Sequence, residues 1–259
     1  MSTEATWRPV HGRAVSVAPG SRPSAPAERT HLQVLRQVED RILDGRLKSG
    51  DRLPAEREFA EMLGVSRGSI REALRVLESM GIVNSGAGRG PDSGCIISGT
   101  PTPALSHLLK MHLALAHFGL ADLVETRVQL EMHAARQAAA QASEADVEHL
   151  SRLVQAMGNP DLPAQDFNAL DTEFHVAIAE ASRNKLLSVL MQSLRDAVQR
   201  EMALASQTLS DWAPIARQLQ LEHLEILQHI RAGDGTGASR LLDAHIRRFY
   251  SDVVTPDEA

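Results

Sequence analysis

Four side chains in the second half of the chain could together hold a metal ion. They occur inside or beside the apolar stripes of three predicted helices, at 164–182, 212–232 and 236–252. The four residues are Asp171, His175, His223 and His245. A buried polar group needs a partner, and one divalent cation would satisfy all four. Imidazole and carboxylate ligands suit zinc, or alternatively nickel or manganese, better than magnesium. Core histidines bonded to backbone carbonyls are the alternative explanation.

A stripe of arginines marks a second candidate site, near the N-terminus. In the helix predicted to begin at Ser66, arginines recur every four residues on one face and apolar residues occupy another. The arginines are Arg67, Arg71 and Arg75, and the apolar residues are Ile70, Ala73, Leu74 and Leu77. The first turn of such a helix can reach base edges, and arginine can contact guanine at two points. A solvated face on an ordinary helix would show the same stripe.

The elements around this helix predict a small N-terminal domain at 29–99. A helix over 31–47 and a second one ending before Gly64 precede it, and a short turn at Gly64 is what a helix-turn-helix requires. Two short apolar runs, at 82–83 and 95–97, predict a hairpin after it. Residues 1–28 are rich in Pro, Ser, Ala and Gly and predict a mobile tail.

The remaining chain predicts an all-α domain at 104–252, after a Thr-Pro-Thr-Pro linker at 100–103. Seven amphipathic segments follow one another with short breaks, which is typical of an antiparallel helical bundle. They lie at 104–117, 120–141, 144–157, 164–182, 185–206, 212–232 and 236–252. The predicted fold class is therefore mainly α, with a winged helix-turn-helix domain followed by a bundle of about seven helices.

Composition excludes several classes of protein. The 259 residues are 43% hydrophobic and 23% charged, which is unlike a disordered chain. The single cysteine, Cys95, excludes an intramolecular disulfide framework. No run approaches the length of a membrane span, and the N-terminus lacks the apolar core of a secretory signal, so we expect a cytoplasmic protein with no membrane partner. Residues 1–98 carry 14 Lys and Arg against 12 Asp and Glu, and residues 99–259 carry 13 against 21, so only the N-terminal part is suited to a polyanion.

Four motifs near the N-terminus carry a family resemblance. They are LPAERE at 53–58, VSR at 65–67, REALRVLE at 71–78 and the glycine at 81. Together they resemble the winged helix-turn-helix domain of GntR-type bacterial transcription regulators. The resemblance implies that Arg57, Arg67 and Arg71 contact the operator and that Ser66 and Ser69 lie near phosphates or bases.

The resemblance also implies that the hairpin is a wing that places Arg89 and Gly90 near the minor groove. The sequence departs from the family at this point, because Pro91 to Gly94 extend the wing tip. Asp92, within that extension, would repel phosphate.

The second half resembles the ligand-binding FCD domain of the FadR-type branch of these regulators. The matching strings are DLVETR at 122–127, LDTEFH at 170–175, NKLL at 184–187, EH at 222–223 and DAH at 243–245. The resemblance implies that Asp171, His175, His223 and His245 are metal ligands, and that Arg127 faces the carboxylate of a bound effector. A surface ion pair with Glu131 is the alternative for Arg127. Asn184 matches an effector-binding position, although a helix N-cap would explain it equally well.

These features predict a dimeric transcription regulator, with repression as the expected direction, that binds a palindromic operator and responds to a small carboxylate at the metal. A regulator that senses the metal itself is one alternative. A metalloenzyme is another, since such a metal could activate water. Against the enzyme, Glu173 and Glu222 are expected to face away from the ligands, which leaves no spare general base.

Overall fold

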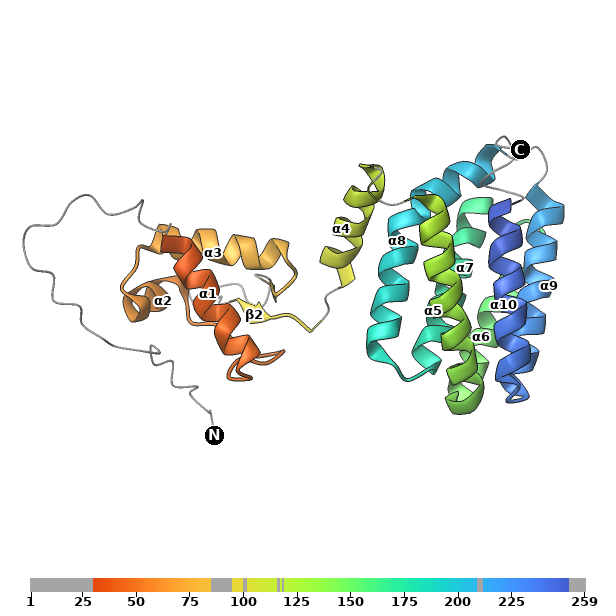
Figure 1. Ribbon diagram of the computed structural model, residues 1–259, viewed down its shortest axis with the longest axis horizontal. Coiled ribbons are helices and arrows are strands. Elements are labelled where there is room, and N and C mark those ends of the chain that lie inside the picture. Colours follow the sequence, from red (N-terminus) through yellow and green to blue (C-terminus); the bar gives the residue numbers. More distant parts are fainter. Residues whose placement is uncertain are drawn as a thin grey trace, which may run out of the picture. The chain divides into compact units, whose positions relative to one another are not determined.

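The computed structural model describes residues 30–84, 95–99, 102–115, 117, 119–208 and 212–251 (Figure 1). The predicted tail at 1–28 and the wing tip with Arg89 and Gly90 lie outside the described residues. The chain divides into two compact units, residues 1–104 and 105–259, which we call the head and the body. No helix in the described part of the chain combines the length and the apolar character needed to cross a membrane.

The described residues of the head form three helices and a two-stranded antiparallel sheet. These elements are α1 (Thr30–Leu43), α2 (Glu56–Leu63), α3 (Arg67–Ser79), β1 (Val83–Asn84) and β2 (Ile96–Ile97). One apolar side of each helix enters a shared core, in which Val38, Phe59, Ile70 and Leu77 are completely buried. The winged helix-turn-helix predicted from the sequence is therefore the fold of the head.

The turn between α2 and α3 owes its shape to two residues. Gly64 has φ +65°, a left-handed conformation that costs glycine little because it has no Cβ. Ser66 then caps α3, with its Oγ accepting a hydrogen bond from Ser69 N at 3.1 Å. The left-handed turn at Gly64 and the N-cap at Ser66 together fix where α3 begins.

The hairpin includes a contact that the sequence did not indicate. Val83 pairs with Ile97 and Asn84 with Ile96. Arg52, which precedes α2, forms an isolated bridge with Ile96 on the other side of β2. The sheet is thereby tied to the segment that leads into α2.

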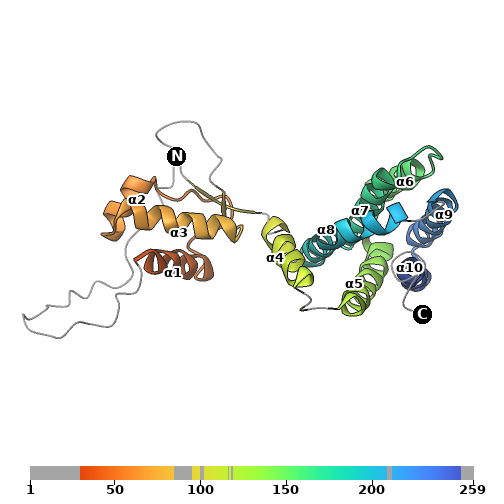
Figure 2. The same cartoon turned by 90° about the horizontal axis from the view of Figure 1, so that it is seen from above.

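In its described residues the body contains seven helices, and α5 to α10 stand side by side as a bundle (Figure 2). The helices are α4 (Thr102–Ala114), α5 (Leu120–Gln141), α6 (Glu144–Met157), α7 (Ala164–Ala181), α8 (Lys185–Thr208), α9 (Trp212–Arg231) and α10 (Gly235–Phe249). Within the bundle, α10 packs against α5 and α9, and α7 packs against α6 and α8. The predicted helix 104–117 is shifted, because α4 begins inside the predicted linker at 100–103 and ends at Ala114.

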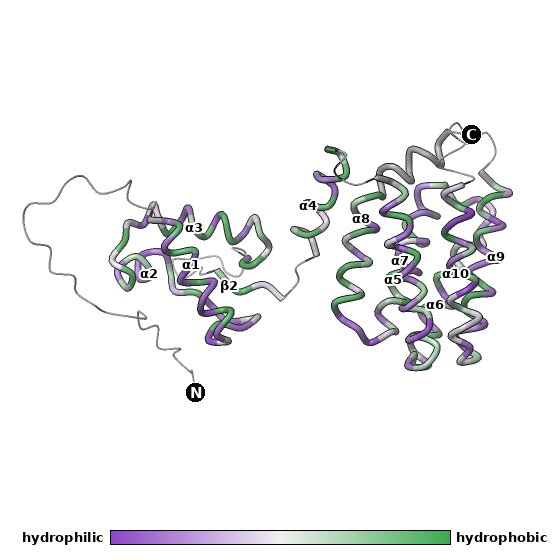
Figure 3. Tube along the Cα trace, viewed as in Figure 1, coloured by the Kyte–Doolittle hydropathy of each residue, from purple (hydrophilic) through white to green (hydrophobic). Residues whose placement is uncertain are grey.

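The C-terminal pair of helices shows how the bundle is specified. Apolar and polar residues alternate along α9 and α10 with helical period (Figure 3). Ile226, Ile230, Leu242 and Ile246 are almost completely buried. The turn between the helices is short, and Asp234 begins α10 by accepting a hydrogen bond from Gly237 N at 2.9 Å. This arrangement sets the registers of α9 and α10 relative to each other.

Candidate metal centre and nucleic-acid interface

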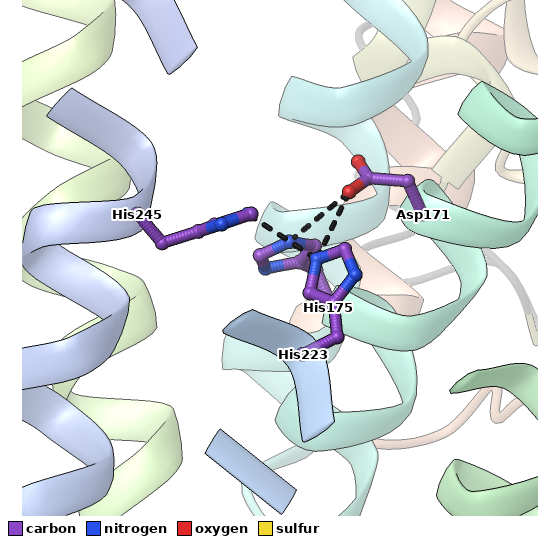
Figure 4. Close-up of side chains that lie close together, drawn as sticks. All are labelled: Asp171, His175, His223 and His245. Carbon is purple, nitrogen blue, oxygen red and sulfur yellow. Dashed lines mark hydrogen bonds and ion pairs between the residues drawn. The ribbon is translucent and has the colours of Figure 1, made fainter. Parts of the chain in front are cut away.

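The four side chains predicted to bind metal converge in the core of the body. Asp171 and His175 come from successive turns of α7, His223 comes from α9 and His245 from α10, and they point toward one another (Figure 4). One ligand atom from each lies within 4.8 Å of all the others, and all four residues are buried. Three helices thus contribute to one point that sequence spacing alone could not locate.

The atoms at this point are those that a metal ion would use. His223 Nε2 lies 3.2 Å from Asp171 Oδ1 and 3.2 Å from His245 Nε2, and His175 Nε2 lies 3.6 Å from Asp171 Oδ1. Ligands of a tetrahedral zinc ion are about 3.3 Å apart, given zinc–nitrogen distances near 2.0–2.1 Å. His175 Nε2 is buried, and among the described residues it has no hydrogen-bond partner. A divalent ion would supply that missing partner, so the donor set fits a metal.

The protonation states suit metal binding as well. Burial lowers the pKa of His223 to about 3, against a hydrogen bond with Asp171 that raises it. Burial, reinforced by the nearby His175, lowers the pKa of His245 to about 3. Both rings are therefore neutral at neutral pH, which is the form of imidazole that ligates a metal. Burial alone would raise the pKa of Asp171, but the Arg195 guanidinium holds it well below its usual value, so this ligand is a carboxylate.

Three of the four ligands are held from behind by charged groups that the sequence analysis missed. Glu131 of α5 contacts His175 Nδ1, and Glu222 Oε2 lies 2.7 Å from His245 Nδ1. Arg195 of α8 places its Nη1 2.6 Å from Asp171 Oδ2. Partners of this kind fix ring orientation and strengthen ligation.

The expectation that Glu222 faces away from the ligands is wrong. Its position on α9 does point about 100° from that of His223, but α10 packs against that side. The Glu222 carboxylate therefore reaches His245, and it also contacts Arg248. A neighbour on the next helix supplies the contact, and helix spacing contains no information about that neighbour.

Arg127 lies in the same buried network, with a side chain only 2% exposed. Its Nη2 and Nε donate to Glu131 Oε1 at 2.9 and 3.2 Å, and its Nη1 donates to Tyr250 Oη at 2.6 Å. The ion pair with Glu131 thus exists, but inside the bundle rather than on its surface. Because Glu131 also contacts His175, one carboxylate connects Arg127 to the cluster.

Asn184 lies at the turn between α7 and α8, where it is exposed. Its Oδ1 accepts a hydrogen bond from Leu187 N at 3.2 Å, so it caps α8. The turn is roughly 10 Å beyond His175 along the axis of α7, at a rise of about 1.5 Å per residue. The interactions of Asn184 with described residues keep it at this turn, and the structure does not bring it to the cluster.

In the head, α3 presents its arginines to solvent. Arg67 and Arg75 are exposed in the first and third turns, and Ser66 and Ser69 lie at the start of the helix. Arg71 is half exposed and forms an ion pair with Glu56 of α2 at 2.8 Å. Its hydrogen bond also lowers the pKa of Glu56. Arg71 therefore joins the two helices of the motif as well as lining the exposed face.

Arg57 lies on α2, apart from this pair. It is 77% exposed and lies 3.7 Å from Glu61 on the same helix, a surface contact of little energetic weight. The structure thus places Arg57, Arg67 and Arg71 on the two helices of the helix-turn-helix motif.

Comparison with known proteins covers both units. Residues 30–91 match the GntR family of bacterial regulatory proteins, and residues 122–248 match the FCD domain. The chain is 32% identical over 228 residues to an Escherichia coli (strain K12) protein whose name links it to regulation of an L-lactate dehydrogenase operon. That match covers 87% of each chain. The chain is also 31% identical to the HTH-type transcriptional regulator LutR of Bacillus subtilis (strain 168), and that match covers 79% of this chain and 92% of LutR.

A solved structure is similar to the chain over both units. The structure entitled Streptococcus agalactiae GntR matches 86% of this chain and all of its own, with a TM-score of 0.56 and 25% sequence identity. The similarity extends across head and body, so it concerns the combination of the two units and not one of them alone.

The geometry predicts about one tightly bound divalent ion per chain and a supporting role for Glu222. His223→Ala removes one of the four metal-ligating side chains and should abolish zinc binding. Glu222→Gln should lower zinc affinity by about 10- to 100-fold, as loss of a partner behind a ligand typically does. Glu225→Gln, an exposed position on the same helix, is the matched control and should bind as the wild type does. Zinc affinity is measured by competition with a coloured chelator. Equal affinity of Glu222→Gln and wild type would contradict the assigned role.

Proposed function

Because the chain belongs to the GntR family of bacterial regulatory proteins, it is a transcription regulator and not an enzyme, and we propose that a small organic acid bound at its metal centre controls its affinity for an operator. The observation that carries the proposal is the convergence of Asp171, His175, His223 and His245 on one point. The four are proposed to hold a divalent ion, with zinc as the first choice and nickel or manganese as alternatives.

The charge of the centre favours an acid as the ligand. Two buried carboxylates, Glu131 and Asp171, lie against two buried guanidinium groups, Arg127 and Arg195. These four charges balance, so a divalent ion leaves the site positive. Four protein ligands also leave room in the coordination shell of an ion such as nickel or manganese. A carboxylate would supply negative charge and complete the shell.

The geometry of metal coordination favours one class of organic acid. A 2-hydroxy or 2-keto acid offers two adjacent oxygens to one metal ion, while its carboxylate could also meet the fork-shaped arginine groups. Arg127 is proposed as such an anchor, and Asn184 is retained only as a weaker candidate because it caps α8. The relative whose name concerns an L-lactate dehydrogenase operon makes L-lactate, a 2-hydroxy acid, the first probe to use.

On DNA, we propose that two chains form a dimer that places two heads on a palindromic operator. Arg57, Arg67 and Arg71 would contact the operator, with Ser66 and Ser69 near phosphates or bases, and Arg89 and Gly90 of the wing would lie near the minor groove. Repression is the expected direction, although one similar protein of Escherichia coli (strain K12), 31% identical, is named as an activator of the Glc operon. The acid can alter operator affinity only by favouring one arrangement of the dimer over another.

The second candidate is a regulator for which the metal itself is the signal. The same buried cluster favours it, because the free energy of metal binding would stabilise the body directly. The two candidates separate in one experiment. Operator binding is followed at a fixed, saturating zinc concentration while acid is added, and then without acid while zinc is varied.

The DNA proposal predicts a specific loss of affinity in the head. A duplex selected from a random-sequence pool by the purified protein should contain an inverted repeat. Arg67→Ala should then weaken binding by about 1–3 kcal/mol if the side chain contacts a base. Arg152→Ala, at an exposed position on α6 of the body, should leave binding unchanged. The measurement is a titration at fixed salt, because phosphate contacts alone make affinity depend on salt. If Arg67→Ala, Arg71→Ala and Arg57→Ala all bind like the wild type, the proposed interface is incorrect.

The effector proposal predicts that acid binding requires the metal. Zinc-loaded protein should bind L-lactate, and His175→Ala or chelated protein should bind it at least about tenfold more weakly, the equivalent of about 1.4 kcal/mol. Propionate, which lacks the hydroxyl group, should bind more weakly than lactate to the loaded protein. Arg127→Lys keeps the charge but loses the fork, so it should reduce lactate affinity while retaining zinc. Calorimetry measures all four. If the acid binds equally well with and without metal, the effector does not bind at the metal centre.

A further inference from the structure

A cavity lies at one end of the bundle, and none of the four metal-centre residues lines it. Its volume is about 800 Å³, which falls within the usual range of small-molecule sites, about 300–1,000 Å³. The end of α6, the turn that follows it, the first turn of α7 and the first turns of α9 surround it. The packing of α9 against α6 holds the two sides of the cavity together.

The walls of this cavity are mainly apolar. Phe167 and Trp212 meet edge to face, with ring centroids 5.4 Å apart, and Leu162 and Pro214 extend the apolar surface. Leu221 also lines the cavity and is 45% exposed, so its side chain lies at the solvent side. Aromatic and aliphatic walls of this kind bind the apolar body of a ligand and exclude water from it.

The polar side chains that line the cavity are the amides of Asn159 and Gln220, the indole of Trp212 and the guanidinium of Arg217. Arg217 is exposed on α9, and among the described residues it has no ion-pair partner. Trp212 Nε1 is a buried donor that lacks an acceptor in the described part of the chain. None of the described residues that line the cavity is Asp or Glu. The body carries eight more acidic than basic residues, so a cavity whose described lining holds an arginine and no carboxylate is less unfavourable to an anion than most of its surface.

We propose that this cavity is a second ligand site and that it binds an organic acid with an aromatic or branched aliphatic body. The apolar body would lie against Phe167 and Trp212, and the carboxylate would face the Arg217 guanidinium. Such a pairing is both charge-assisted and capable of two parallel hydrogen bonds. Trp212 Nε1, a buried donor without an acceptor among the described residues, would serve a second polar atom of the ligand.

The site is separate from the metal centre, although one helix serves both. Gln220 lines the cavity, and His223 follows it by one turn of α9. Arg217 and Trp212 lie farther back along the helix, roughly 9 and 16 Å from the level of His223 at about 1.5 Å per residue. A ligand held by Arg217 therefore has no direct contact with the metal ligands, and its binding does not depend on the ion.

The test uses 4-phenylbutyrate as the probe and the full chain as the protein. Trp7→Phe removes the only other tryptophan, so that fluorescence reports Trp212 alone. We expect saturable binding of one probe per chain by calorimetry, with a matching change in Trp212 emission. Arg217→Gln should weaken binding at least about tenfold, because hydrogen bonds to charged groups contribute on that order. Arg240→Gln, at an exposed position on α10, is the matched control and should bind within about twofold of the parent, as distant surface changes do.

Three further comparisons keep the result interpretable. The neutral analogue 4-phenylbutanol should bind more weakly than the acid, and Leu221→Glu, which places a like charge at the mouth, should abolish binding of the acid. His175→Ala should bind the probe as the parent does, whether or not the metal centre functions as proposed above. Absence of saturable binding overturns the inference, as does unchanged affinity in Arg217→Gln. Loss of binding in His175→Ala also overturns it, provided that the circular dichroism and melting temperature of the variant match those of the parent, since that would place the acid at the metal.

Discussion

The balance of buried charge in the centre of the body is the constraint on which the rest of its structure depends. Glu131 and Asp171 are carboxylates inside a helical bundle, where an unpaired charge is prohibitively costly. Arg127 of α5 and Arg195 of α8 approach them to 2.9 and 2.6 Å. Replacing these ionic groups with apolar ones of similar shape often stabilises a protein. Their presence therefore indicates a role for the charges themselves, which hold imidazole and carboxylate ligands in fixed orientations.

Much of the architecture could be predicted because its signals are local. Ser66 indicates the start of α3, and Gly64 indicates the end of α2. Apolar periodicity with short breaks indicates the seven helices that the described residues of the body form. The four residues of the cluster could be selected because each lies on or beside an apolar stripe. Their convergence on one point could not be derived from spacing, since it depends on how α7, α9 and α10 pack.

The charged partners behind the ligands show both a missed signal and a physical limit. Arg127 and Glu131 follow Leu123 at four-residue intervals on α5, and Arg195 follows Met191 by four on α8, so all three lie within apolar stripes. The criterion that selected the histidines would have selected these residues too. Glu222 is different, because its contact depends on the side chain of His245 on another helix. No pattern within α9 contains that information.

The arrangement of the four ligands has a consequence for how the body opens. Asp171 and His245 are far apart in sequence, and a shared ion would join α7, α9 and α10 as a removable crosslink. Such a link would stabilise the folded body, because the four ligands converge only in the folded chain, and it must break before α10 can separate from the bundle. Hydrogen exchange and protease sensitivity of the C-terminal helix would then follow the occupancy of the centre. The metal would thus govern the local lifetime of the folded body as well as its chemistry.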